Sequence, residues 1–131
     1  MTGFGTMSLG DVISELRKAE PGATVQFDFC YTAPSLEIHS YRGWYNHLAI
    51  GWEDTHRPKH HGTYWPLATD LLAKLEGAVG GTFTGYKGGD YTMDGDTPLW
   101  VANFSQTGST AIDRIECDGS VVIIHTKRVD F

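Results

Sequence analysis

The chain has little cysteine, and its two cysteines form no recognisable motif. Cys30 and Cys117 lie far apart among 131 residues and are not spaced as a Cys-x-x-Cys pair. That spacing would have indicated a metal or redox site, and disulfides are rare in reducing compartments. We therefore expect each cysteine to be a small buried hydrophobe rather than half of a disulfide.

Long apolar runs and excess positive charge are also missing. No stretch approaches the roughly 18 apolar residues of a membrane-spanning helix, and the start, MTGFGTMSLGDV, lacks the basic and apolar regions of a secretory signal. Lys and Arg number 10 against 16 Asp and Glu, which gives a net charge of −6. Non-specific nucleic-acid binding depends on neutralised phosphates. These features predict a cytoplasmic protein with no membrane partner and no nucleic-acid polymer as partner.

The length and the hydrophobic pattern predict one domain spanning residues 1–131. Ser8 and Asp11 form a capping-box pattern before an apolar helical stripe, and a second helix is expected from Leu67 to Val79, ended by Gly80 and Gly81. Strands are expected over 23–31, 36–53 (as one or two strands), 82–86, 99–104, 111–117 and 120–126, with a turn or bulge over 33–35 and a hairpin turn at 118–119. These elements predict an α+β fold, in which two helices pack on a mostly antiparallel β-sheet.

Two short segments carry the most suggestive chemistry. SYRGWY over 40–45 and GYKGGDY over 85–91 each place a tyrosine, a cation, a glycine and then another aromatic residue in sequence. Arginine suits phosphate groups, aromatic rings stack on nucleobases, and glycine permits close approach of the backbone. The candidate ligand-binding residues are Tyr41, Arg42, Gly43, Trp44, Tyr45, Tyr86, Lys87, Gly88, Gly89 and Tyr91.

An alternative interpretation of these segments is structural. The rings of Tyr41, Trp44 and Tyr45 could pack in a core or a subunit interface, with Arg42 paired to a surface carboxylate. The residue types alone favour this packing interpretation over a ligand site. The ligand interpretation predicts instead that Arg42 and its rings face the 85–91 segment across one pocket, within or between subunits.

No metal site, cofactor or recognised catalytic motif is predicted. The acidic loop from Asp90 to Asp96 does not follow the EF-hand pattern, so turn formation by Asp-Gly explains it more simply. In HRPKHHG over 56–62, a proline between the histidines disfavours a helix that would present them together. His39 and His125 lack the His-x-Ser/Thr pattern of two-histidine phosphoesterases, and the chain has no GxSxG, HExxH, Walker or GxGxxG motif.

SYRGWYNHLAIGW and FTGYKGGDYTMDGDTPLWVANF resemble segments of a family of small proteins encoded by tailed bacteriophages of Gram-positive hosts. The resemblance covers most of the chain and carries no catalytic or binding residues with it. It implies a viral setting in the infected host cell, where small non-structural proteins often counter host defence. We therefore expect an anti-defence protein that acts as a sponge: it binds and sequesters a nucleotide-derived immune signal, of cyclic oligonucleotide or ADP-ribose type. Such proteins commonly assemble, so a homo-oligomer is expected.

Two other functions stay open. One is a phosphodiesterase-like enzyme that cleaves such a nucleotide, with an acid or base from His39, His47, Asp90 or Asp94. The other is an inhibitor that presents its aromatic patch to a host defence protein, because Trp, Tyr and Arg are frequent interface anchors.

Overall fold

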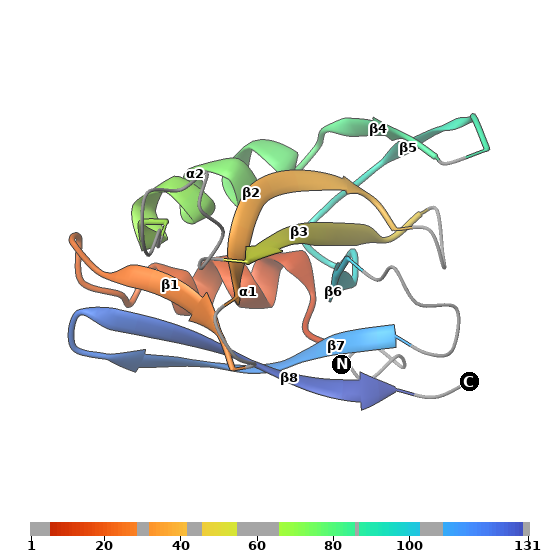
Figure 1. Cartoon of the computed structure of the whole chain (residues 1–131). Helices are drawn as coiled ribbons and strands as arrows, with labels where there is room; N and C mark the ends of the chain where they lie inside the picture. Colours follow the sequence, from red (N-terminus) through yellow and green to blue (C-terminus); the bar gives the residue numbers. More distant parts are fainter. Residues whose placement is uncertain are drawn as a thin grey trace.

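A computed structural model describes residues 6–28, 32–41, 46–54, 66–85, 87–102 and 109–129 (Figure 1). The elements are α1 (Leu9–Leu16), β1 (Thr24–Phe27), β2 (Thr32–Ser40), β3 (Leu48–Asp54), α2 (Ala68–Ala78), β4 (Thr82–Thr84), β5 (Asp90–Thr92), β6 (Leu99–Val101), β7 (Ser109–Asp118) and β8 (Val121–Val129). Within the described part of the chain, no helix has the length and apolar character needed to cross a membrane.

Six strands form one strongly curved sheet in the order β1-β8-β7-β6-β3-β2. The pairs β2–β3, β6–β7 and β7–β8 are antiparallel, whereas β1 pairs with β8 and β3 pairs with β6 in parallel. The strands at the two ends of this order, β1 and β2, contact each other, so the sheet curls into a near-barrel. Strands β4 and β5 form a separate two-stranded hairpin beside β2 (Figure 1).

The predicted fold class is therefore wrong. The protein is mostly β, with 48% strand and 20% helix, and its two short helices accompany a near-barrel sheet rather than forming a layer on a mostly antiparallel one. The physical reason is that hydrophobic periodicity identifies strands without identifying their partners. Both parallel pairs join strands far apart in sequence, which the local pattern cannot reveal.

The first helix begins as its capping pattern predicts. The Ser8 hydroxyl accepts the Asp11 N–H at 3.1 Å, and the Asp11 carboxylate accepts the Ser8 N–H at 3.4 Å. Two further N–H groups in the first turn, those of Leu9 and Gly10, donate at 2.8 Å to the carbonyls of Thr97 and Gly95. The acidic DGDT turn over 94–97 therefore helps to cap α1 through its backbone.

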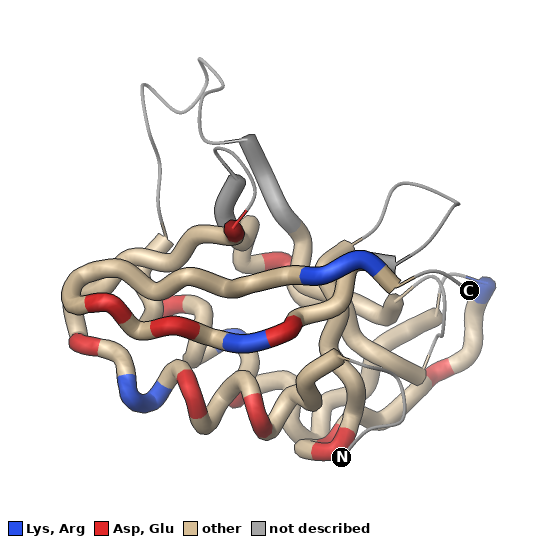
Figure 2. The backbone as a smooth tube through the Cα atoms, turned by 90° about the horizontal axis from the view of Figure 1, so that it is seen from below, with Lys and Arg blue, Asp and Glu red and all other residues tan. Residues whose placement is uncertain are grey.

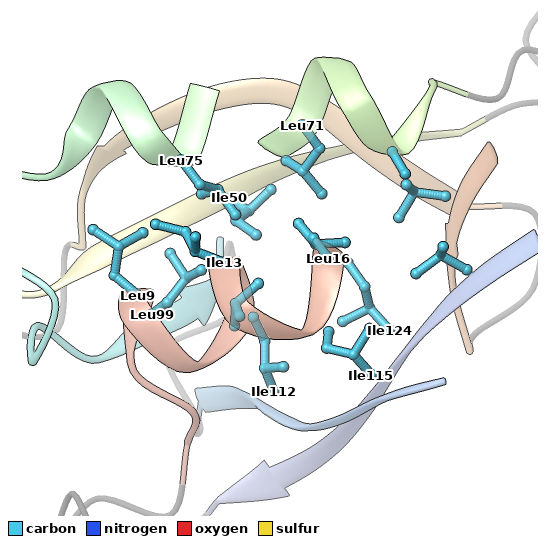
Figure 3. Close-up of a cluster of buried hydrophobic side chains, with 14 of the residues drawn as sticks. Leu9, Ile13, Leu16, Ile50, Leu71, Leu75, Leu99, Ile112, Ile115 and Ile124 are labelled. Atoms are coloured by element: carbon cyan, nitrogen blue, oxygen red, sulfur yellow. The ribbon is translucent and has the colours of Figure 1, made fainter. Parts of the chain in front are cut away.

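The main core lies on the inner face of the curved sheet, between the sheet and the two helices. Figure 3 shows α1 between α2 and the β7–β8 pair, with side chains from all of these elements converging. The buried members from the helices are Leu9, Val12, Ile13, Leu16, Ala68, Leu71, Leu75 and Ala78. A second, smaller cluster contains Tyr41, Ala49, Trp100, Ala102 and Ala111. Because Ala49 and Trp100 alternate with inward-facing neighbours along β3 and β6, this cluster lies on the outer face of the sheet.

Two local predictions have different outcomes. A bulge is present, but it lies slightly later than the turn or bulge expected over 33–35: Ala33 and Pro34 pair regularly with β3, the register shifts between Pro34 and Ile38, and Leu36 has a positive φ of 67°. The expectation of a buried cysteine is wrong for Cys117, which is exposed near the end of β7, while Cys30 lies outside the described residues.

The N-terminal segment completes the sheet between β6 and β7. Met7 donates to the Ile112 carbonyl and accepts the Leu99 N–H, each at 3.0 Å. Beside it, the buried Thr6 hydroxyl donates to the Leu99 carbonyl at 2.7 Å and accepts the Ile112 N–H at 2.8 Å. One hydroxyl group of the N-terminal segment therefore bridges the paired strands β6 and β7.

Replacing Thr6 with valine should lower the free energy of unfolding by about 1–3 kcal/mol, because an isosteric methyl group removes both hydrogen bonds from buried backbone groups. Chemical denaturation would measure the change. Thr6→Ser is the matched control, since it keeps the hydroxyl and loses only a methyl group. If Thr6→Val were as stable as wild type, or less destabilised than Thr6→Ser, the bridge would contribute nothing.

Candidate functional site

Three rings from distant parts of the sequence meet on the outer face of the sheet. Tyr41 follows β2, His47 precedes β3 and Trp100 lies in β6. The Tyr41 and Trp100 rings stack with centroids 5.3 Å apart and planes 12° apart. The Trp100 Nε1–H group donates to His47 Nδ1 at 3.0 Å, and the two rings are nearly parallel at 6°. Their side chains are buried, with no more than 3% exposed.

These rings fix both ends of the connection between β2 and β3. The Tyr41 N–H donates to the His47 carbonyl at 2.9 Å. This backbone hydrogen bond therefore joins the same two residues whose rings contact Trp100. Burial lowers the pKa of His47 below its usual value of 6.5. His47 is therefore neutral near pH 7, as an acceptor at Nδ1 requires.

The second candidate segment forms the tip of the β4–β5 hairpin. The Gly88 N–H donates to the Gly85 carbonyl at 2.9 Å, and the Gly85 N–H donates to the Gly89 carbonyl at 2.8 Å. Gly88 and Gly89 have φ values of 93° and 84°, a left-handed conformation that favours glycine. In the strand pair next to this turn, the Thr84 hydroxyl donates to Asp90 Oδ1 at 3.2 Å. The turn therefore presents an exposed Lys87 beside two exposed glycines.

The structure divides the predicted ligand residues into three groups. Tyr41 is buried in the outer cluster, whereas Tyr91 is half-buried against the main core on the helix side. Lys87, Gly88 and Gly89 lie exposed at the hairpin tip. Arg42, Gly43, Trp44, Tyr45 and Tyr86 lie outside the described residues, and so does the expected pocket between Arg42 and the hairpin. Tyr41 and Tyr91 thus belong to different packed clusters.

The residues considered for acid–base catalysis lie in separate settings. His39 is exposed on β2, and His47 belongs to the buried ring cluster. Asp90 accepts from Thr84 in the hairpin, while Asp94 Oδ1 accepts the Asp96 N–H at 2.8 Å in the turn that caps α1. Among the described residues no group of three His, Cys, Asp or Glu could hold a metal ion. The histidines at 56, 60 and 61 lie outside these residues.

His125, the other histidine considered at the sequence level, belongs to a row of polar side chains that runs from the end of β1 across β8 to β7. Its Nε2 lies 2.7 Å from Glu116 Oε1, and its Nδ1 lies 3.8 Å from Asp28 Oδ2. Asp28 in turn accepts the Thr126 N–H at 2.9 Å and the Thr126 hydroxyl at 2.5 Å. Figure 2 shows acidic and basic positions interspersed along this side of the molecule. These contacts hold the end of β1 to β8.

A shallow groove of about 270 Å³ lies between α1 and β7. Its walls carry Asp11, Glu15, Asp113 and Arg114, and its apolar part is formed by Met7 and Ile115. None of the predicted ligand residues lines this groove. Its carboxylates also have other contacts: Glu15 pairs with Lys18 at 2.7 Å, and Asp113 pairs with Lys127 at 3.4 Å.

The sequence pattern did not identify Trp100 as the ring that contacts Tyr41 and His47. One weak sequence signal for its burial was present. Trp100 lies in the short run LWV, whose three residues are all buried. A short, wholly apolar run indicates a strand buried on both faces, which would have placed a tryptophan on the face opposite Leu99 and Val101. Nothing in the local pattern could have paired it with His47, 53 residues away.

In comparisons with protein-family models, curated proteins and solved structures, no match to the chain was found.

Proposed function

We propose that this protein binds a small nucleotide-derived ligand and retains it without cleaving it. The observation that carries the proposal is the tip of the β4–β5 hairpin, where Lys87 is exposed beside Gly88 and Gly89. A cation next to backbone that lacks side chains suits a phosphate group, because the group can approach both the ammonium and the main chain.

The ring cluster supports a revised role for one predicted residue. Tyr41 is stacked on Trp100 and buried, so we assign it to anchoring its segment rather than to stacking on a base. The residues left for ligand contact are Arg42, Gly43, Trp44 and Tyr45 after it, with Tyr86 and the half-buried Tyr91 from the hairpin. In this proposal Arg42 and Lys87 meet phosphates and the rings stack on a base.

The biological setting follows from the resemblance to phage proteins. We place the ligand among nucleotide immune signals of cyclic oligonucleotide or ADP-ribose type, sequestered in the cytoplasm of an infected host cell by a homo-oligomer. Retention is favoured over cleavage because three of the four acid–base candidates, His47, Asp90 and Asp94, each have a structural partner, while the fourth, His39, is exposed on β2. Light scattering of the purified protein would determine its oligomeric state.

Calorimetry with cyclic di-AMP, cyclic di-GMP and ADP-ribose tests this proposal. We expect one class of probe to bind, and we expect Arg42→Ala and Lys87→Ala each to weaken binding roughly tenfold to hundredfold, the effect of losing one charged hydrogen bond. The matched control is Lys74→Ala, which removes an exposed lysine from α2 and should leave the affinity unchanged.

The same experiment distinguishes the alternatives. No binding of any probe, or equal binding by wild type and Arg42→Ala, would remove the ligand proposal. Cleaved nucleotide recovered after denaturing the complex would support the enzyme instead. A stoichiometric host protein captured by the wild type, together with no affinity for any probe, would support the inhibitor.

A further inference from the structure

The second half of β7 has no neighbouring strand on the side away from β8. Strand β6 pairs with β7 only at residues 110 and 111, and Met7 of the N-terminal segment then donates to the Ile112 carbonyl at 3.0 Å. The chain enters α1 two residues later, so within the described residues no strand runs beside Ile115 and Cys117 on this side. Figure 2 shows α1 alongside β7 here.

The main-chain groups of Ile115 and Cys117 point to this open side. In β8 the Ile124 carbonyl accepts an N–H group from the end of β1 at 3.1 Å, so Ile124 directs its main-chain groups towards β1. These directions alternate along a strand, so Ile123 faces β7, where its partner in the register is Glu116. The two neighbours of Glu116 therefore face away from β8, and each offers one N–H donor and one carbonyl acceptor.

The groove between α1 and β7 lies along this open side and is called here the α1–β7 groove. Its apolar part comes from Met7 and Ile115, and its walls carry one hydroxyl, three carboxylates and one guanidinium, from Ser14, Asp11, Glu15, Asp113 and Arg114. This excess of carboxylates favours a positively charged occupant. The apolar stem of an arginine or lysine can lie on Met7 and Ile115 while its charged end reaches a carboxylate.

The ion pairs that two of these carboxylates already make are weak competitors. Glu15 pairs with Lys18 and Asp113 pairs with Lys127, but the Lys18 side chain is 66% exposed and that of Lys127 is 47% exposed. Exposed pairs of this kind contribute little to stability, because water and salt screen them. A cation that also covers its apolar stem in the groove can therefore replace either lysine.

We propose that the α1–β7 groove is a docking site for an extended, basic segment of a protein partner. The segment adds a strand beside Ile115 and Cys117 and directs an arginine or lysine side chain into the groove. Main-chain pairing supplies affinity, and the carboxylates select for positive charge. This site goes beyond the nucleotide proposal, because its lining residues include none of the predicted ligand residues.

Fluorescence anisotropy tests the chemistry of the occupant with a short labelled peptide in which arginine and valine alternate. We expect this peptide to bind saturably and the same peptide with glutamate in place of arginine not to bind. Methylation of the backbone nitrogens should weaken binding at least about tenfold, because it removes the main-chain donors. Absence of saturable binding by the arginine peptide, or equal binding by the glutamate or the methylated peptide, would overturn the inference.

Substitutions in the groove test where the peptide binds. Ser14→Trp fills the groove from an exposed position of α1 and should weaken binding at least about tenfold. Ala73→Trp, at an exposed position of α2, is the matched control and should leave the affinity unchanged. Glu15→Gln and Asp113→Asn should each weaken binding about twofold to fivefold, whereas Glu37→Gln on β2 should not. Wild-type affinity in Ser14→Trp would place the peptide elsewhere and contradict the assignment.

Hydrogen exchange of single amides, followed by nuclear magnetic resonance, tests the main-chain pairing directly. In the free protein we expect the N–H groups of Ile115 and Cys117 to exchange faster than those of Arg114 and Glu116, which face β8. The arginine peptide should slow exchange at Ile115 and Cys117 at least about tenfold. A helix beside a strand edge can also serve only to shield that edge. In that case the peptide leaves both exchange rates unchanged, and the docking site is disproved.

Discussion

Replacing Trp100 with alanine should lower the free energy of unfolding by about 3–5 kcal/mol, the range for truncating a fully buried aromatic side chain. Trp100 is 0% exposed, and its ring is the common contact of Tyr41 and His47. The substitution leaves a cavity on the outer face of the sheet and removes the donor from His47 Nδ1. Chemical denaturation monitored by far-ultraviolet circular dichroism would measure the loss.

A second substitution at this position separates packing from hydrogen bonding. Trp100→Phe keeps an aromatic ring for Tyr41 and loses the N–H donor to a buried acceptor, so we expect a smaller loss of about 1–3 kcal/mol. Leu67→Ala, at a side chain that is 40% exposed, is the control and should cost less than either. Stability of Trp100→Ala close to that of this control would contradict the assignment of Trp100 to a packed cluster.

The sequence predicted the short-range features well, because their causes are local. The capping box at Ser8 and Asp11 is present, and every member of the first apolar stripe, from Leu9 to Leu16, is buried. The turn at Asp118 and Gly119 joins β7 to β8, with Gly119 at a φ of 58°. A cap or a tight turn involves residues within about four positions of each other, so the pattern of neighbouring residues is enough to identify it.

The architecture could not be predicted in the same way. The Thr6 hydroxyl bonds to Leu99 across 93 residues and to Ile112 across 106. Phe27 pairs with Ile124 in the parallel ladder of β1 and β8. The hydrophobic pattern of a strand indicates which of its faces is apolar, but it does not indicate which other strand pairs with it. The curl of the sheet depends on those partners, and the α+β prediction failed for that reason.

The candidate site shows the same division between local and distant information. The sequence predicts a special backbone conformation at Gly88 and Gly89, because glycine permits it, and both residues have positive φ. The sequence predicts Tyr41 as a ligand-binding ring, yet Tyr41 is buried against Trp100, which lies in a strand distant along the chain. The residue type determines which interactions a side chain can make, while the burial of the side chain determines whether a ligand can reach it.

Helix α2 offers the clearest test of how the helices stabilise the curved sheet. Replacing Leu71 with alanine should lower the free energy of unfolding by about 2–5 kcal/mol, because this fully buried side chain fills the space between α2 and the sheet. Leu71 and Leu75 point from α2 into the core in Figure 3. The neighbouring Leu72 is only partly buried.

Leu72→Ala is therefore the matched control, with the same chemical change in the same helix. Helix propensity contributes equally to both variants, so the difference between them isolates the burial of Leu71. We expect the Leu71 variant to be clearly the less stable in chemical denaturation. Equal losses would mean that α2 lies on the sheet through a broad surface contact rather than by inserting one row of side chains into its inner face. The described residues favour insertion, since Ala68, Leu71, Leu75 and Ala78 form one buried row while Val79 is 47% exposed.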